Sequence, residues 1–300
     1  MPPGPSSTPH VLMLVGAAAC WGVGTVLSKQ TLERGTAPLT LLVIELAASC
    51  TLLIILVGVS GAGSRGPALP RLAALGVLNP GAAYALGLLG LVSISASMSV
   101  LLWATEPVLI VVLAVLVLRE RVAAATVLAV AAALTGVVLV VYRPGATGDA
   151  GGIALTVGAV AACALYAVLT RRWMLDDSSL VVVLAQQAAA LAFALVLAVA
   201  TTVLGLASVG LPDDAGTWLL AAASGAIYYG LAFWLFVGGL RGVPASVAST
   251  FLPLIPVFGL AAGYLTGDRL VERQWLGAAV VVAATVTAAA HHLVRQRNAT

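Results

Sequence analysis

Long apolar runs separated by short polar breaks dominate this 300-residue chain. A helix of about 20 apolar residues is long enough to cross a bilayer. The runs do not alternate with a period of two, as barrel strands do, and a helix satisfies its backbone hydrogen bonds within the segment. The pattern therefore predicts ten helical spans, near residues 11–30, 38–58, 71–91, 95–117, 124–142, 151–171, 179–204, 217–238, 244–266 and 275–294.

Turn and cap signals separate these spans. Residues 61–70 form a Gly/Pro/Ser loop, and the stretch from Arg143 to Gly152 is the longest polar break in the middle of the chain. Asp176-Asp177 and Pro212-Asp213-Asp214 are typical of turns and helix N-caps. The Pro/Ser-rich residues 1–10 and the short stretch 295–300 are predicted to be tails.

Composition places the chain in a membrane and leaves no room for a soluble domain. The chain is 61% hydrophobic and 8% charged, whereas charged residues make up about 25% of soluble proteins. The net charge is +3, without a cluster of Lys and Arg, so we expect no nucleic-acid partner. The cysteines at 20, 50 and 163 all lie in apolar runs and have no metal-binding spacing. We expect no cofactor and no metal.

Positive charge in the loops predicts the orientation. Cytoplasmic loops carry an excess of Lys and Arg, and ten spans place both termini on one side. The terminal side has nine such residues and the other has five, which predicts both termini in the cytoplasm, with the chain in the cytoplasmic membrane. The nine are Arg65, Arg71, Arg119, Arg121, Arg171, Arg172, Arg241, Arg295 and Arg297; the five are Lys29, Arg34, Arg143, Arg269 and Arg273.

The chain also repeats itself. Gly90-Leu91-x4-Ala96-Ser97 recurs as Gly239-Leu240-x4-Ala245-Ser246, an offset of 149 residues (239 − 90). Nearer the N-terminus the offset is 142, which pairs Ser28 with Thr170.

Two halves, residues 11–145 and 150–294, therefore hold five spans each. Because five is odd, the second half must cross the membrane in the opposite sense, as an inverted repeat about an axis in the membrane plane. The predicted fold class is an all-α membrane protein of ten transmembrane helices in two inverted five-helix repeats. Folds of this kind usually serve alternating access to a central site.

Paired motifs in the two halves carry a family resemblance. They are Trp21-Gly22 with Lys29, Ala96-Ser97, Pro107-Val108 and Arg119-Glu120-Arg121, then Ala245-Ser246, Pro256-Val257 and Gly267-Asp268-Arg269. Over residues 11–294 the chain resembles the drug/metabolite transporter superfamily, and within it the EamA-type permeases. The resemblance implies ten helices and passage of small metabolites through a central cavity. Arg119 stands where that family usually has Gly, Asp268 where it has Glu, and Cys163 where it often has an aromatic residue.

Two acids, Glu45 and Glu106, lie deep within predicted spans. An ionised carboxylate at the centre of a membrane helix costs roughly 2.5–3.5 kcal/mol, so such acids are typically functional. Each is a candidate for binding a cation or proton in the cavity; the alternative is a structural acid that is paired or kept protonated. Neither has an acidic twin, because Ile255 matches Glu106 and Gln186-Gln187 matches Glu45.

Polar and aromatic residues complete the predicted substrate site. Trp103 shares a helix face with Glu106 and offers a surface for a cationic group, although it could equally pack between helices. Membrane amides must find hydrogen-bond partners on another helix or on substrate. The further candidates are Trp21, Asn79, Tyr84, Tyr166, Gln186, Gln187 and Tyr228.

Enzymatic functions fit the sequence poorly. Gly58-Val59-Ser60-Gly61 matches a serine-nucleophile pattern, but every histidine is terminal, so the serine lacks a base. No phosphate-binding loop encodes ATP use. We expect a secondary transporter of a small, amino-acid-like metabolite, or alternatively a proton-coupled multidrug exporter of lipophilic cations. Protons are a candidate coupling ion, membrane lipid surrounds the protein, and both a monomer and a homodimer remain open.

Overall fold

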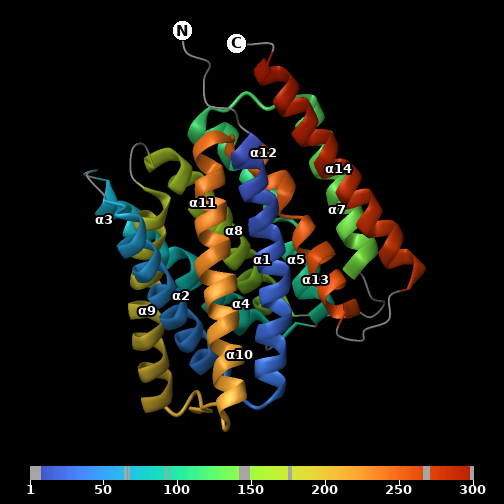
Figure 1. Cartoon of the computed structure of the whole chain (residues 1–300). Helices are drawn as coiled ribbons and strands as arrows, with labels where there is room; N and C mark the ends of the chain where they lie inside the picture. The colour runs from blue at the N-terminus through green and yellow to red at the C-terminus, as the bar shows by residue number, and fades with distance from the viewer. Residues whose placement is uncertain are drawn as a thin grey trace.

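The computed structural model describes residues 8–63, 66, 68–91, 93–94, 96–141, 149–174, 178–265 and 271–297, and they are almost entirely helical (Figure 1). The first half comprises α1 (Thr8–Glu33), α2 (Pro38–Ser60), α3 (Leu69–Gly76), η1 (Val77–Ala82), α4 (Ala83–Leu91), α5 (Ala96–Trp103), α6 (Glu106–Leu113), η2 (Ala114–Leu118) and α7 (Ala124–Val141). The second comprises α8 (Ala150–Trp173), α9 (Ser179–Val203), α10 (Ala215–Gly225), η3 (Ala226–Leu231), α11 (Ala232–Gly242), α12 (Ala245–Ala248), η4 (Ser249–Phe251), α13 (Leu254–Leu265) and α14 (Glu272–Arg297).

These elements make ten crossings. Within the described residues, nine helices are long and apolar enough to span a membrane. The tenth crossing is α3–η1–α4, where Asn79 interrupts the helix with φ −149° and ψ 123°. The prediction of a ten-helix, all-α membrane fold is confirmed. α1 begins and α14 ends at the same end of the bundle (Figure 1).

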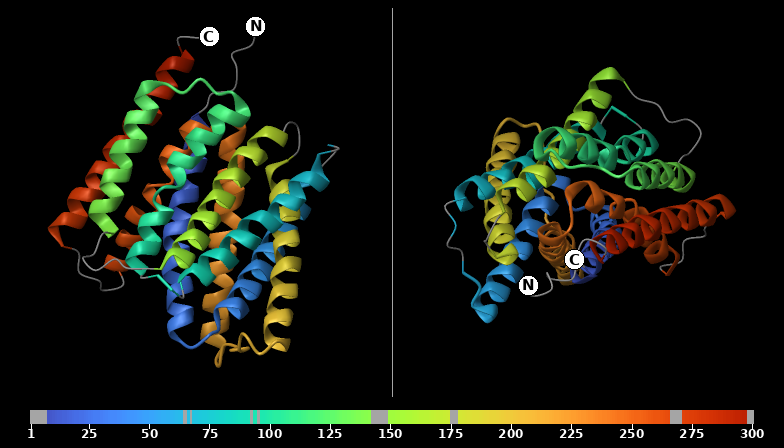
Figure 2. Two further views of the ribbon diagram at one scale, coloured as in Figure 1. Left: turned by 180° about the vertical axis from the view of Figure 1, so that it is seen from behind. Right: turned by 90° about the horizontal axis from the view of Figure 1, so that it is seen from above.

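The contacts between the halves occur in symmetric pairs. α1 packs on α11 and α13, and α8 packs on α4 and α6 in the equivalent way. α2 packs on α10, and α3 packs on α9. Two further pairs, α2 with α9 and α7 with α14, join equivalent helices, and the second pair lies side by side at one edge of the bundle (Figure 2). Each half thus completes the other about a pseudo-two-fold axis.

Glycines let the helices approach closely at equivalent places. A Cβ on Gly76 would collide with the backbone of Gln186, and a Cβ on Gly225 with the backbone of Glu45. Gly225 is the counterpart of Gly76 at the offset of 149 residues. The α3–α9 and α10–α2 contacts are therefore the same contact, made once in each half.

Charged and polar side chains fix several helix ends. The Asp214 carboxylate accepts hydrogen bonds from the Thr217 hydroxyl and the Thr217 backbone N–H at the start of α10. These bonds hold the pKa of the Asp214 carboxyl below its usual value. Glu120 lies just after η2 and accepts hydrogen bonds from the N–H groups of Ala245 and Ser246, 2.9 and 3.1 Å away. Glu120 therefore caps the N-terminus of α12, which belongs to the other half. This contact lies at the end of the bundle where α1 begins (Figure 1).

The backbone conformation at Arg119, one departure from the family pattern, is one that favours glycine. Its φ is +56°, in the left-handed region, where it ends η2. A side chain there costs roughly 1–2 kcal/mol, and glycine avoids this cost. The glycine usual at this position would therefore suit the observed backbone better than arginine does.

We expect the Arg119→Gly substitution to stabilise the protein by about 1 kcal/mol, which raises the unfolding temperature by about 2 °C. The measurement is thermal unfolding of the detergent-solubilised protein followed by intrinsic fluorescence. Arg121→Gly removes the same charge at a position without positive φ, and it is the matched control. An equal or lower unfolding temperature for Arg119→Gly would contradict the prediction.

Candidate functional site

Four interrupted spans meet inside the bundle. The third is broken at Asn79, next to Pro80. The fourth turns at 104–105, just before Pro107, and the ninth turns at 252–253. The eighth is π-helical through η3. Third and eighth spans are repeat counterparts, as are fourth and ninth, so the irregular backbone is placed symmetrically. Such backbone is tolerated at membrane depth where it is buried in protein or lines a cavity.

A cavity of about 530 Å³ occupies this region. Residues from both halves line it, and every interrupted span contributes to its wall. Most of the lining is aromatic or aliphatic. The lining residues are Trp21, Thr25, Asn79, Tyr84, Gly87, Ser99, Trp103, Ala104, Glu106, Pro107, Val137, Cys163, Tyr166, Ala167, Tyr228, Phe233, Phe236, Leu252, Pro253, Ile255 and Pro256.

Among the described residues that form this wall, Glu106 is the only acid. It begins α6, so the positive end of the helix dipole lies beside its carboxylate. The side chain is half-buried. Among the described residues, its carboxylate has no hydrogen-bond or ion-pair partner. An acid in this position is open to a donor that enters the cavity.

Aromatic rings make up much of the same cavity wall. The Tyr84 hydroxyl donates to the Tyr228 hydroxyl at 2.6 Å, which joins the third span to the eighth. The Tyr84 ring lies 6.3 Å from the Trp103 ring, centroid to centroid. Trp21 packs edge-on against Phe233 at 5.4 Å. Ring faces of this kind attract organic cations and bind apolar bodies.

Two further polar groups meet on the wall at the broken third span. The Cys163 thiol donates to the Asn79 side-chain oxygen at 3.3 Å. Cys163 lies in an apolar run and is buried, and it also lines the cavity. Within the described part of the chain, no group of three His, Cys, Asp or Glu side chains could hold a metal ion.

The structure brings most of the predicted site residues together. Those that line the cavity are Trp21, Asn79, Tyr84, Trp103, Glu106, Tyr166 and Tyr228. Glu45, Gln186 and Gln187 lie outside it. Whether any of these residues binds substrate stays a prediction.

Glu45 was expected to face the cavity together with Glu106, and the structure places it elsewhere. Its side chain is 4% exposed and lies between α1, α2 and α10. One carboxyl oxygen is 2.5 Å from the Ser28 hydroxyl and 2.6 Å from the Ser224 hydroxyl. The close α2–α10 contact at Gly225 holds the acid behind the wall, one layer away from the cavity.

The glutamine pair is also used between helices. Gln186 accepts a hydrogen bond from the Tyr166 hydroxyl at 2.8 Å and donates one to the Thr170 hydroxyl at 3.2 Å. Gln187 donates to the Tyr229 carbonyl at 3.0 Å. The sequence left open whether these amides bond to another helix or to substrate. The hydrogen bonds in the structure are to other helices.

Sequence reasoning missed Phe233, Phe236 and Thr25 as wall residues. Phenylalanine is unremarkable in a membrane helix, so composition gave no signal for it. The internal repeat did contain a signal for Phe233, because Phe233 is the counterpart of Tyr84 at the offset of 149 residues. A wall residue in one half therefore predicts one in the other.

The cavity lies off-centre in the bundle. Ser99 lies in the first turn of α5, and Val137 lies within the last two turns of α7, both near the end remote from the termini. Thr25 is exposed and lines the cavity on the same side. Toward the opposite end, the lining stops at Ala167 and Phe236, about two turns before their helices end. That opposite end is also where Glu120 caps α12.

Ten crossings, inverted halves and a central cavity define the class of this protein as a multi-pass membrane transporter. The sequence profile of the EamA-like transporter family matches residues 8–142 and 150–289. The chain belongs to this family, which comprises transporters and not, in general, enzymes. The resemblance expected from the paired motifs is confirmed.

The fold of this chain is similar to that of a solved structure. A solved crystal structure, described only as that of a protein, is similar with a TM-score of 0.82 and 19% identity, covering 94% of this chain and 96% of the other. At that identity the likeness shows the fold alone. No curated protein sequence matches the chain significantly.

Cys163 provides a built-in probe of the side on which the cavity opens. In a Cys20→Ala/Cys50→Ala background, we expect a small, membrane-impermeant thiol reagent to modify Cys163 from the side remote from the termini, because the cavity reaches closest to that end. The measurement is mass spectrometry of protein labelled from each side of oriented vesicles. A Cys163→Ala variant of the same background is the control, and preferential labelling from the terminal side would contradict the prediction.

Proposed function

We propose that this chain is a secondary transporter that moves a small organic molecule bearing a protonated amine across the cytoplasmic membrane by alternating access. An amino-acid-like metabolite that carries such an amine but no carboxylate is the substrate that we favour. The observation that supports this proposal is the unpartnered Glu106 carboxylate in a cavity shared by both halves. An entering ammonium group supplies the charge and the hydrogen bonds that this carboxylate lacks.

The size and chemistry of the cavity agree with such a substrate. A volume of about 530 Å³ falls within the range of roughly 300–1,000 Å³ that is usual for small-molecule sites. Glu106 is suited to bind the amine, and the rings of Trp103, Tyr84 and Tyr228 are suited to enclose the rest of the molecule. The acceptor oxygen of Asn79 lies on the same wall.

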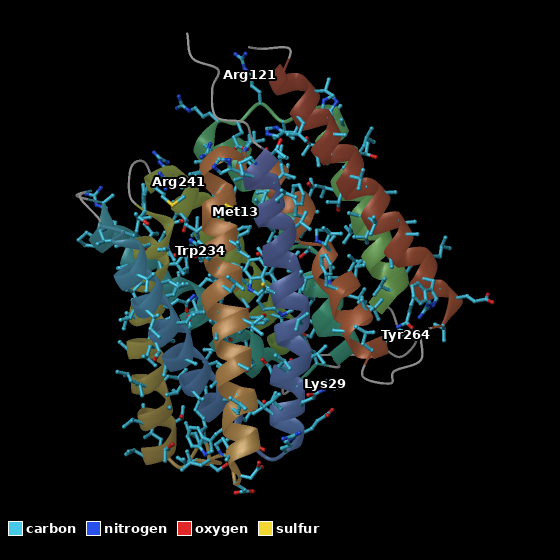
Figure 3. All side chains as sticks on the ribbon, viewed as in Figure 1. Met13, Lys29, Arg121, Trp234, Arg241 and Tyr264 are labelled. Atoms are coloured by element: carbon cyan, nitrogen blue, oxygen red, sulfur yellow. The ribbon has the colours of Figure 1, made fainter. Side chains whose placement is uncertain are left out.

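The inverted halves support alternating access. Each half can adopt the conformation of the other, so rocking about the central site exposes it first to one side and then to the other. The loop charges support termini in the cytoplasm, and Arg121 and Arg241 lie at the end of the bundle where α1 begins, with Lys29 at the other (Figure 3). In that orientation the cavity extends toward the outer face of the membrane.

One observation favours the second candidate, a proton-coupled exporter of lipophilic cations. The lining contains no Lys, Arg or His among the described residues. A carboxylate on the substrate would therefore have no cationic side chain to pair with. A lipophilic cation has no carboxylate, so the lack of a cationic side chain costs it nothing.

Glu106→Gln removes the charge and keeps the shape of the side chain. We expect the affinity for tryptamine to fall roughly thirtyfold, because a hydrogen bond to a charged group contributes about 2 kcal/mol. The measurement is calorimetric titration of the purified protein with tryptamine. Glu33→Gln is the control, because Glu33 is an exposed acid paired with Lys29 at 3.6 Å. Unchanged affinity would remove Glu106 from the binding site.

A competition panel separates the two substrate classes. Tryptophan, tryptamine and tetraphenylphosphonium share an aromatic body, but only tryptophan carries a carboxylate. We expect tryptamine to compete best if a protonated amine is the recognised group, because it pairs with Glu106 and leaves no anion unpaired. The measurement is inhibition of labelled tryptamine uptake into liposomes. Stronger inhibition by tetraphenylphosphonium than by unlabelled tryptamine would favour the lipophilic-cation exporter, and stronger inhibition by tryptophan than by unlabelled tryptamine would contradict a site that recognises the amine alone.

A further inference from the structure

Two buried polar side chains occupy equivalent places in the two halves. Glu45 on α2 is packed against Gly225, and Gln186 on α9 is packed against Gly76, in the paired glycine contacts described above. Glu45 is bonded to Ser28 of α1, and Gln186 to Thr170 of α8. Ser28 and Thr170 are themselves repeat counterparts. An acid in one half thus takes the place that a neutral amide fills in the other.

The hydrogen bonds around Glu45 can be counted. The Ser224 oxygen lies 2.6 Å from the Glu45 oxygen and 2.9 Å from the Ala221 carbonyl, and a hydroxyl has one proton to donate. With that proton on the Ala221 carbonyl, as is common for a helical serine, the short contact with Glu45 needs a proton on the acid. A continuous chain then runs from the Ser28 hydroxyl to the Glu45 carboxyl, to the Ser224 hydroxyl and to the Ala221 carbonyl.

A neutral Glu45 would accept one hydrogen bond and donate one, as Gln186 does. The amide of Gln186 accepts one hydrogen bond, from Tyr166, and donates one, to Thr170. Both serines contact the same Glu45 oxygen, so in a neutral acid that oxygen would carry the proton, donate it to Ser224 and accept from Ser28, whereas Gln186 accepts and donates through two different atoms. An ionised carboxylate can only accept, so it would break this correspondence.

The surroundings of Glu45 offer no countercharge. The titratable side chains that interact with it from the facing segment are Tyr228 and Tyr229 of η3. Ser28 and Ser224 supply the contacts from α1 and α10. Among the described residues, Glu45 has no ion pair, and burial of an unpaired charge is costly.

Glu45 also lies one layer behind the cavity. Tyr228 lines the cavity and lies close to the acid, and Thr25 lines it one turn before Ser28 on α1. The Glu45–Ser224 contact joins the first half to the second. Loss of a proton from Glu45 leaves two acceptors for the single Ser224 proton, so release would change a contact between the moving halves.

We infer that Glu45 is a proton-binding site separate from the substrate site at Glu106, and that it couples the movement of the halves to proton uptake and release. The step is the binding of one proton by the Glu45 carboxylate to give the neutral acid, and its loss on the opposite side. This inference rests on the proposed transport function for the coupling, but its structural part, the neutral acid, does not.

The structural part is tested by infrared spectroscopy of the wild-type protein in liposomes at neutral pH, without substrate. We expect a C=O stretching band of a buried carboxylic acid that Glu45→Gln removes and that Glu106→Gln retains. Ser224→Ala keeps the acid but removes a partner, so it should shift the same band. A spectrum that neither Glu45→Gln nor Ser224→Ala changes would overturn the inference.

A swap variant tests the equivalence of the two places. In Glu45→Gln/Gln186→Glu, the acid moves to the second half, where Tyr166 can donate a hydrogen bond to it and Thr170 can accept one from it, both from α8. We expect the carboxylic acid band to return. A folded swap variant without the band would show that the two places are not equivalent.

The coupling is tested with tryptamine in the same liposomes. Glu45→Gln should still exchange tryptamine across the membrane but should lose accumulation driven by a pH gradient. Gradient-driven accumulation that persists in Glu45→Gln would overturn the coupling. Absence of any tryptamine exchange by the wild type would instead contradict the amine transport proposed above, and the infrared bands would still decide the state of Glu45.

Discussion

Backbone hydrogen bonding in lipid is the constraint on which this structure depends. A chain that crosses a bilayer must satisfy its N–H and C=O groups internally, which an unbroken helix does. Four of the ten crossings are nevertheless interrupted, by Asn79 and Pro80, by the turn before Pro107, by the π-helical η3 and by the turn at Pro253. All four interruptions border the same cavity. In these four crossings, the unbroken helical hydrogen bonding is thus given up inside the bundle, away from lipid, and the candidate site lies at the same place.

Duplication places these interruptions in register, and substitution has then made the two halves chemically different. The prolines at 107 and 256 keep the breaks at matching depths, and Gly76 and Gly225 keep matching contacts. The acids do not match, since Ile255 and the glutamine pair stand opposite Glu106 and Glu45. The backbone is thus symmetric, while asymmetry of the side chains leaves one acid at the cavity and one at the interface of the halves.

The sequence predicted the fold well because its main signals are long and repeated. Ten apolar runs, separated by turn residues, correspond closely to the observed crossings, and the offset of 149 residues identified the inverted halves. The cavity was predicted less completely. Trp103 and Glu106 were expected on one helix face, and both line the cavity, although the turn at 104–105 separates their helices. Apolar periodicity cannot tell a phenylalanine in the wall from one in the core, so Phe233 and Phe236 were missed. Nor could it show that Glu45 faces α10, because that depends on the close approach of helices at Gly225.

The two membrane acids meet the cost of burial in different ways. Glu106 begins a helix and lies on the wall of a cavity, so its charge is offset by the helix dipole and by whatever enters. Glu45 is almost fully buried, and a neutral acid suits its short contact with Ser224 when the Ser224 hydroxyl donates its proton to the Ala221 carbonyl. An ionised carboxylate at that depth would cost roughly 2.5–3.5 kcal/mol without a partner. A charge that persists suits recognition of a cation, whereas a charge that appears only when a proton leaves suits a switch between the halves.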